Sequence, residues 1–112
     1  RTDTALDLLA EMNERGLEPN VITYNAAISS CEKGGRADTA LDLLAEMKER
    51  GLEPDVITYN AAISACEKGS RTDTALDLLD EMKGRGIEPD VITYNAAISA
   101  CEKGSRTETA LG

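Results

Sequence analysis

The stretch VITYNAAISACEKGSRTDTALDLLDEMKGRGIEPD, residues 56–90, carries the pattern that decides the fold of this chain. The preceding residues, 21–55, repeat it and differ only at Ser30/Ala65, Gly35/Ser70, Ala37/Thr72, Ala45/Asp80, Glu49/Gly84 and Leu52/Ile87. Residues 1–20 match the end of the same unit, and residues 91–112 match its beginning. A fixed period of this length is typical of repeat arrays, in which neighbouring units complete one another's core. The sequence therefore predicts one array over residues 1–112 rather than a closed domain around a single active site.

Each unit contains two segments with helical periodicity, which in the first complete unit are residues 22–33 and 36–50. Apolar side chains recur at three- and four-residue spacing along one side of each segment, as in helices that pack on one face. They are Tyr24, Ala27, Ile28 and Cys31 in the first segment and Ala40, Leu41, Leu44 and Met47 in the second. Short connections force such helices to be antiparallel. We therefore expect an all-α fold, a right-handed α-solenoid of antiparallel helix-turn-helix repeats.

Punctuating residues place the helix ends. Asn20, Asp55 and Asp90 precede the first helix of successive units and are predicted to be its N-caps. Glycines follow its end and are expected to adopt the left-handed conformation that terminates a helix. They are Gly34, Gly69 and Gly104. For the second helix, Ser70 with Asp73 and Ser105 with Glu108 fit a capping box at the start, and Gly51 marks a stop.

Composition limits the classes of function. The net charge is -9 without any His, which by itself disfavours nucleic acid because phosphate binding rests on Lys and Arg. Much of the negative charge, however, falls on the outer side of the second helix, at Asp38, Asp42, Glu46 and Glu49. The first helices are therefore free to line a groove that is not acidic. No apolar run approaches the roughly 18 residues of a membrane span.

Three cysteines, Cys31, Cys66 and Cys101, occupy the same position of successive units. Stacked helices lie about 8–10 Å apart. That separation exceeds the Cα–Cα distance of about 7 Å that a disulfide can bridge. A spacing of 35 residues also fits no zinc-ligand pattern. These cysteines are therefore predicted to be small core thiols, and we expect neither a metal site nor a cofactor.

The motifs of the unit resemble the pentatricopeptide repeat. They are Val56-Ile57-Thr58-Tyr59-Asn60 at the start, Ala75-Leu76-Asp77-Leu78-Leu79-Asp80-Glu81-Met82 in the middle and Gly86-Ile87-Glu88-Pro89-Asp90 at the end. The resemblance covers the whole chain. Tetratricopeptide repeats have a similar period, but their Trp and Leu-Gly positions have no counterpart here.

This resemblance implies binding of single-stranded RNA in mitochondria or chloroplasts, with RNA processing as the context and about one base read by each repeat. In that family two residues of each unit, its fifth and its last, select the base, and Asn with Asp favours uracil. The complete pairs here are Asn25 with Asp55 and Asn60 with Asp90, whereas Asn20 and Asn95 each lack a partner. The resemblance further implies that Ile22, Ile57 and Ile92 sandwich the bases and that Lys33, Lys68 and Lys103 lie near phosphates.

Residue chemistry agrees with these roles. Uracil presents acceptor, donor and acceptor groups on its pairing edge, and a side-chain amide supplies one donor and one acceptor group. Each assignment also has a structural alternative. The aspartates are good N-caps, and a lysine near a helix C-terminus is favourable without any ligand. Mid-helix Asn residues on an unpacked side are harder to explain by stability alone.

We therefore expect a binding protein for U-rich single-stranded RNA, with no catalytic residues and no nuclease or deaminase segment in this chain. No targeting segment is expected in it either. The alternative is a protein-interaction scaffold of the tetratricopeptide-like kind that binds no RNA, which the negative net charge favours. Both ends of the chain are also expected to leave a repeat interface open. Leu6, Leu9 and Met12 would be bare at one end, and Tyr94, Ile98 and Cys101 at the other, which predicts head-to-tail self-association.

Overall fold

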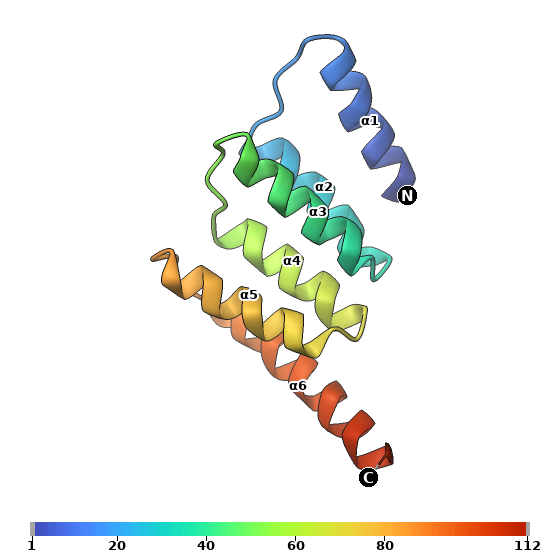
Figure 1. Ribbon diagram of the computed structural model, residues 1–112, viewed down its shortest axis with the longest axis vertical. Coiled ribbons are helices and arrows are strands. Elements are labelled where there is room, and N and C mark those ends of the chain that lie inside the picture. The colour runs from blue at the N-terminus through green and yellow to red at the C-terminus, as the bar shows by residue number, and fades with distance from the viewer. Residues whose placement is uncertain (1, 112) are drawn as a thin grey trace.

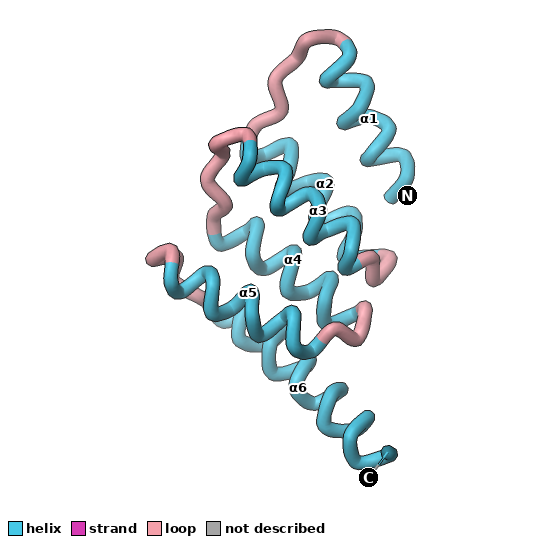
Figure 2. The backbone as a smooth tube through the Cα atoms, in the orientation of Figure 1, coloured by secondary structure: helices cyan, strands magenta, loops and turns pink. Residues whose placement is uncertain are grey.

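The computed structural model describes the backbone of residues 2–111 and the side chains of residues 5–104, and throughout this part the chain forms helices joined by short loops (Figures 1 and 2). The helices are α1 (Thr2–Glu14), α2 (Val21–Lys33), α3 (Ala37–Glu49), α4 (Val56–Lys68), α5 (Thr72–Gly84) and α6 (Val91–Leu111). Successive helix pairs repeat along an elongated body of 52 × 30 × 20 Å. The expected all-α repeat array is confirmed. No helix in the described part is long and apolar enough to cross a membrane.

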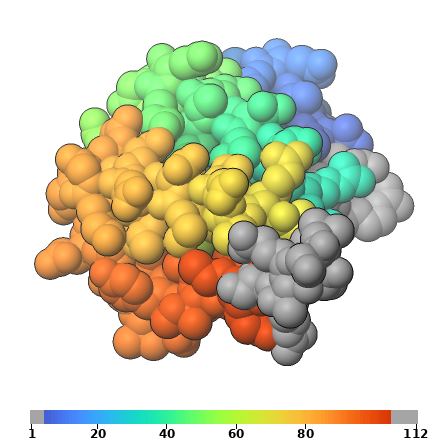
Figure 3. All heavy atoms as spheres, turned by 60° about the horizontal axis from the view of Figure 1, so that its bottom comes forward, coloured from blue at the N-terminus to red at the C-terminus, as the bar shows by residue number. Residues whose placement is uncertain are grey.

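The helices form two layers (Figure 1). In one layer α4 packs between α2 and α6, so the first helices of successive units are in direct contact. In the other layer α3 packs against α2 and α4, α5 packs against α4 and α6, and α1 packs on α2. No Cα atom of α3 lies within 8 Å of one in α5. Side chains nevertheless fill the space between these two helices, which share one outer surface (Figure 3).

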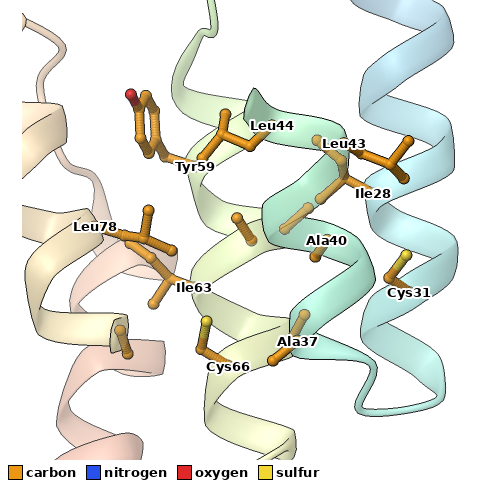
Figure 4. Packing of buried hydrophobic residues seen from close by; sticks show 14 of the residues in the cluster. Ile28, Cys31, Ala37, Ala40, Leu43, Leu44, Tyr59, Ile63, Cys66 and Leu78 are labelled. Carbon is orange, nitrogen blue, oxygen red and sulfur yellow. The ribbon is translucent and has the colours of Figure 1, made fainter. Parts of the chain in front are cut away.

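The hydrophobic core lies between the two layers of helices (Figure 4). Equivalent residues of successive units are fully buried in it, namely Tyr24 and Tyr59, Ile28 and Ile63, Cys31 and Cys66, and Met47 and Met82. The face predicted to pack in the first helix is confirmed, because Tyr24, Ala27, Ile28 and Cys31 are all buried. Cys31, Cys66 and Cys101 are free thiols, and the last of them is exposed.

Each buried tyrosine ties the two layers together through its hydroxyl. Tyr24 donates a hydrogen bond to Glu46 of α3, and Tyr59 donates one to Glu81 of α5. Burial, reinforced by the neighbouring carboxylate, raises the pKa of Tyr24 to about 12. Glu46 was expected on the outer side, but it is half-buried because it accepts this bond.

The turns after α2 and α4 correct the expected helix stops. The left-handed residues are Gly35, with φ +64°, and Ser70, with φ +61°, one position later than Gly34 and Gly69. With the left-handed residue at Gly35, the backbone N–H of Arg36 donates to the carbonyl oxygen of Cys31 at 3.0 Å. This bond satisfies a carbonyl group in the last turn of α2. This 6→1 bond is the Schellman arrangement, whose left-handed residue lies just after the C-cap. Gly51 has φ +78° and stops α3 as expected.

The capping box predicted for the second helix at Ser70 and Asp73 is wrong. Arg36 and Arg71 occupy the N-cap positions of α3 and α5, and neither makes a side-chain cap bond. Ser70 already supplies the left-handed turn residue one position earlier. The side chains of Ser105 and Glu108 lie outside the described residues.

The last helix also differs from expectation, because Gly104 does not end it and α6 continues to Leu111. Residues 105–111 therefore extend α6, whereas the corresponding residues of the earlier units form the separate helices α3 and α5.

At the first end of the array the prediction is wrong, because Leu9 is buried against α2 and Leu6 and Met12 are half-buried. Leu8 is the exposed residue there, at 59%, although its equivalents Leu43 and Leu78 are 5% exposed. At the other end Tyr94, Ile98 and Cys101 are exposed as expected, while their equivalents in α4 are fully buried.

Ser70 and Gly35 offer a matched test of turn strain. A left-handed conformation costs a non-glycine residue about 1–2 kcal/mol, of which glycine's greater unfolded-state entropy offsets part. We expect Ser70→Gly to increase the free energy of unfolding by about 0.5–1 kcal/mol. Gly35→Ala should decrease the free energy of unfolding for two reasons. The added Cβ would lie 3.3 Å from Lys68 O, and alanine would have to adopt the positive φ of this turn. Urea unfolding followed by circular dichroism measures both, and a destabilised Ser70→Gly chain would contradict this account.

Candidate nucleic-acid interface

The first helix of every unit begins with a reciprocal capping box. The side-chain Oδ1 atoms of Asn20 and Asp55 accept the backbone N–H groups of Thr23 and Thr58, each at 3.0 Å. Asp90 accepts that of Thr93 at 3.1 Å. The threonine hydroxyl in turn accepts the backbone N–H of the capping residue. The predicted N-cap role of Asn20, Asp55 and Asp90 is confirmed, and it satisfies amides that would otherwise have no partner.

Each capping aspartate, the last residue of its unit, also contacts the mid-helix asparagine of that same unit. Asn25 Nδ2 of α2 donates to Asp55 Oδ1 at 3.2 Å, and Asn60 Nδ2 of α4 donates to Asp90 Oδ1 at 3.0 Å. The structure thus brings together both pairs named from the sequence. Asn20 has no such asparagine before it in this sequence. Asn95 is exposed on α6.

Sequence reasoning missed a third member of this cluster. The hydroxyl of Thr58 donates to Asn25 Oδ1, and that of Thr93 donates to Asn60 Oδ1. Both threonines have 0% of their surface exposed, and they are the buried polar residues of the described part. The signal was present in the sequence, because a capping residue followed three positions later by Thr fits a capping box.

The aspartates are held in their ionised form. Partial burial raises the pKa of Asp55, but hydrogen bonds from Thr58 and Asn25 outweigh it and lower the pKa below its usual value. The bonds from the Thr93 amide and from Asn60 lower the pKa of Asp90. Since an ionised carboxylate only accepts hydrogen bonds, each asparagine must turn its NH₂ group toward it.

Apolar side chains stand beside this polar cluster. Ile22, Ile57 and Ile92 are 77%, 59% and 62% exposed, one on each first helix. Because these side chains are largely exposed, they contribute little to the packing of the hydrophobic core. Flanking the polar pairs, they are available to contact a flat apolar surface.

Two of the three predicted phosphate lysines pair with glutamates. Lys68 Nζ lies 3.6 Å from Glu32 Oε2, and Lys103 Nζ lies 2.6 Å from Glu67 Oε2. Lys33 is exposed at the end of α2. The hydrogen bond from Lys103 holds the pKa of Glu67 below its usual value despite partial burial. The surface formed by the first helices is therefore less basic than expected, because each of these glutamates offsets the lysine of the next unit.

Together these features define a class of protein, an α-helical repeat array whose unit boundaries present one recurring polar cluster beside exposed isoleucines. A family model for the pentatricopeptide repeat domain matches residues 7–69, and one for the PPR repeat family matches residues 54–103. The chain belongs to the pentatricopeptide repeat family. None of the curated proteins compared with it matches.

Solved structures agree. The pentatricopeptide repeat protein PPR10 from maize matches 96% of this chain and 16% of its own length, with a TM-score of 0.82 and 35% identity. PPR10 in complex with an 18-nt psaJ RNA element covers 87% of this chain and 14% of its own, with a TM-score of 0.79 and 37% identity. This chain thus spans a small part of the maize protein's length.

A more distant relative shows the fold alone. The PPR domain of Arabidopsis thaliana protein-only RNase P 1, solved in complex with tRNA, is 17% identical. Its TM-score is 0.80 over 96% of this chain and 55% of that domain's chain.

The capping carboxylates make stability depend on pH. Because the pKa values of Asp55 and Asp90 are lowered by folding, their contribution is present above the unfolded value of about 4 and is lost as pH falls through the folded values. We expect Asp55→Asn with Asp90→Asn to flatten the fall of melting temperature between about pH 4 and pH 2. Asn20 shows that an amide caps the same turn. Asp42→Asn, on the exposed outer side of α3, is the control, and an equal flattening there would contradict the assignment.

Proposed function

We propose that this array binds single-stranded, U-rich RNA along the first helices of its units and performs no chemistry on it. The observation that carries the proposal is the Asn–Asp pair, repeated with the same geometry at two successive unit boundaries. Asn25 with Asp55 and Asn60 with Asp90 are each joined through Nδ2 and Oδ1. One such cluster for each unit is what a modular reader of one base per repeat needs.

The chemistry of the amide supports uracil as the base. After its contacts with Asp55 and Thr58, the Asn25 amide keeps one N–H and one carbonyl lone pair. A uracil edge can donate its N3–H to that lone pair and accept the N–H at a carbonyl oxygen. Neighbouring Ile22 and Ile57 would cover the faces of the base, more weakly than aromatic rings would.

Relatives support RNA as the ligand. PPR10, at 37% identity, has been solved with an 18-nt RNA element. By family resemblance the parent protein would act in a mitochondrion or chloroplast, in RNA processing. Acidic side chains on the outer surface favour the second candidate, a scaffold for a protein partner.

Titration of labelled oligo-U, oligo-A and oligo-C against a longer array of the 56–90 unit tests the proposal. Preferential binding of oligo-U supports it. Equal affinity for all three removes the base-reading role, and absence of binding favours the scaffold. For the 112-residue chain the slope of log K against log salt should be shallow, less steep than the roughly -2 that three phosphate-bound lysines would give, because Glu32 and Glu67 hold two of them.

Asn25 and Asn60 carry the base choice in this proposal. In a long array with Asn→Thr at this position of every unit, preference should move from U toward G, because the family assigns Thr with Asp to that purine. Competition between labelled oligo-U and oligo-G measures the change. Unchanged preference for oligo-U would leave the asparagines only a packing role.

Glu32 and Glu67 compete with phosphate for the lysines in this proposal. Glu32→Gln with Glu67→Gln should raise the affinity of the chain for oligo-U a few-fold at low salt and steepen the salt slope, since two cations become available. Asp42→Asn with Glu49→Gln changes the net charge equally on the outer side of α3. An equal gain in this control would show an effect of net charge rather than of the groove.

Self-association of the 112-residue chain follows from its exposed repeat surfaces. Leu8 at one end and Tyr94 and Ile98 at the other are exposed at positions whose equivalents are buried within the array. We propose that α1 of one copy packs on α6 of the next, a head-to-tail contact that can propagate. Sedimentation over a concentration series should show growing oligomers, and a polar capping helix added after Gly112 should abolish them. A chain that stays monomeric at high concentration contradicts this contact.

A further inference from the structure

Two fully buried hydroxyl groups lie at the boundaries between units, one on Thr58 and one on Thr93. Each belongs to the third residue of its unit and points back to the asparagine of the unit before. The backbone amide of Asp55 donates to Thr58 Oγ1 at 3.0 Å, so the hydroxyl oxygen is already used as an acceptor. Its single proton is left to be donated.

That proton has two acceptors within reach, Asn25 Oδ1 at 2.5 Å and Asp55 Oδ1 at 2.9 Å. Asp55 Oδ1 already accepts from the Thr58 amide and from Asn25 Nδ2. Asn25 Oδ1 is nearer and has no other donor among the described residues. The hydroxyl proton therefore belongs on the asparagine carbonyl, and the same arrangement recurs at Thr93 and Asn60.

The amide of Asn25 is consequently held from both sides. Asp55, an acceptor, fixes the NH₂ end, and Thr58, a donor, fixes the carbonyl end. Rotating the amide by 180° would place C=O against a carboxylate, where neither group can donate, so the contact with Asp55 would be lost. It would also end the bond from the Thr58 hydroxyl to the asparagine carbonyl, and that hydroxyl would have to turn its proton toward Asp55 Oδ1 at 2.9 Å in order to accept from NH₂. One N–H and one lone pair remain for a ligand, in a fixed order along the groove.

We propose that Thr58 and Thr93 are specificity-determining positioning residues, which set the orientation of the asparagine amide and thereby the choice between uracil and cytosine. This inference rests on the proposed RNA-binding function. Uracil presents N3–H and a carbonyl oxygen where cytosine presents bare N3 and an amino group. An amide rotated by 180° exchanges its donor and acceptor, so it would suit cytosine. The hydroxyl opposes that exchange by its bond to the carbonyl end of the amide, together with the carboxylate at the NH₂ end, and it does so without touching the base.

The chain contains its own control in Thr23. This residue makes the same capping box with Asn20, and its hydroxyl donates to Asn20 Oδ1 at 3.1 Å. The given sequence contains no fifth-position asparagine of an earlier unit to face it. Thr23→Val therefore removes the cap contribution alone, whereas Thr58→Val removes the cap contribution and the bond to Asn25.

The first measurement needs no variant and no RNA. Side-chain amide hydrogen exchange, followed by NMR on the full chain, should be slower for Asn25 and Asn60 than for the exposed Asn95. Exchange at Asn25 should accelerate in Thr58→Val, return toward the original rate in Thr58→Ser, and stay unchanged in Thr23→Val. Equal exchange at all three asparagines in the unsubstituted chain would overturn the positioning role even if no variant folds.

The second measurement is discrimination between oligo-U and oligo-C by the full chain. Loss of one hydrogen bond should reduce the U-to-C affinity ratio about threefold to tenfold for each altered unit. The expected result is this loss in Thr58→Val with Thr93→Val, recovery in the two Ser variants, and no change in Thr23→Val. An unchanged ratio in the folded double Val variant, or an equal loss in Thr23→Val, overturns the inference. If the unsubstituted chain binds no oligonucleotide, the proposed function fails, and amide exchange still decides whether Thr58 positions Asn25.

Discussion

At the two unit boundaries that end in aspartate, one carboxylate oxygen both caps a helix and joins two helices. Asp55 Oδ1 caps α4 through the Thr58 amide and also accepts from Asn25 of α2. The contact with Asn25 can form only if α2 and α4 approach at the correct distance and angle. The boundary geometry and the surface chemistry are therefore set by the same few atoms. A change in helix packing would alter the polar cluster, and a change in the cluster would leave a helix end without its cap.

Packing of the first helices supports this arrangement. Tyr59, Ile63 and Cys66 of α4 are fully buried against the second helices, which leaves the opposite side of α4 to carry polar groups. Because the same residues recur in α2, neighbouring units present matching surfaces to each other. One kind of interface therefore joins all the units, and the polar cluster recurs at the two boundaries that end in aspartate.

Sequence periodicity predicted most of the architecture. Buried faces, helix order and the N-caps at Asn20, Asp55 and Asp90 all follow from local spacing, which one unit already contains. The errors arise where the outcome depends on more than spacing. The left-handed residue falls at Gly35 rather than Gly34 because a 6→1 hydrogen bond needs one more residue. Leu8 rather than Leu9 is bare because the packing partner of α1 lies on only one side.

The candidate site could be predicted in part. The pairing of Asn25 with Asp55 came from a family resemblance, and the structure brings the two side chains together. The buried hydroxyl of Thr58 and the glutamates beside Lys68 and Lys103 were not anticipated, since they involve contacts between units. The sequence pattern of one unit does not predict which side chains of the next unit will contact it.

The two layers differ in how tightly they are joined, and this has a mechanical consequence. The first helices touch directly, whereas α3 and α5 are linked across a gap by long side chains, as in the bonds of Lys48 with Glu81 and Arg71 with Asp38. Such partly exposed ion pairs each contribute little to stability. We therefore expect the array to bend more readily by a change in the spacing of its second helices than by a change in the spacing of its first helices.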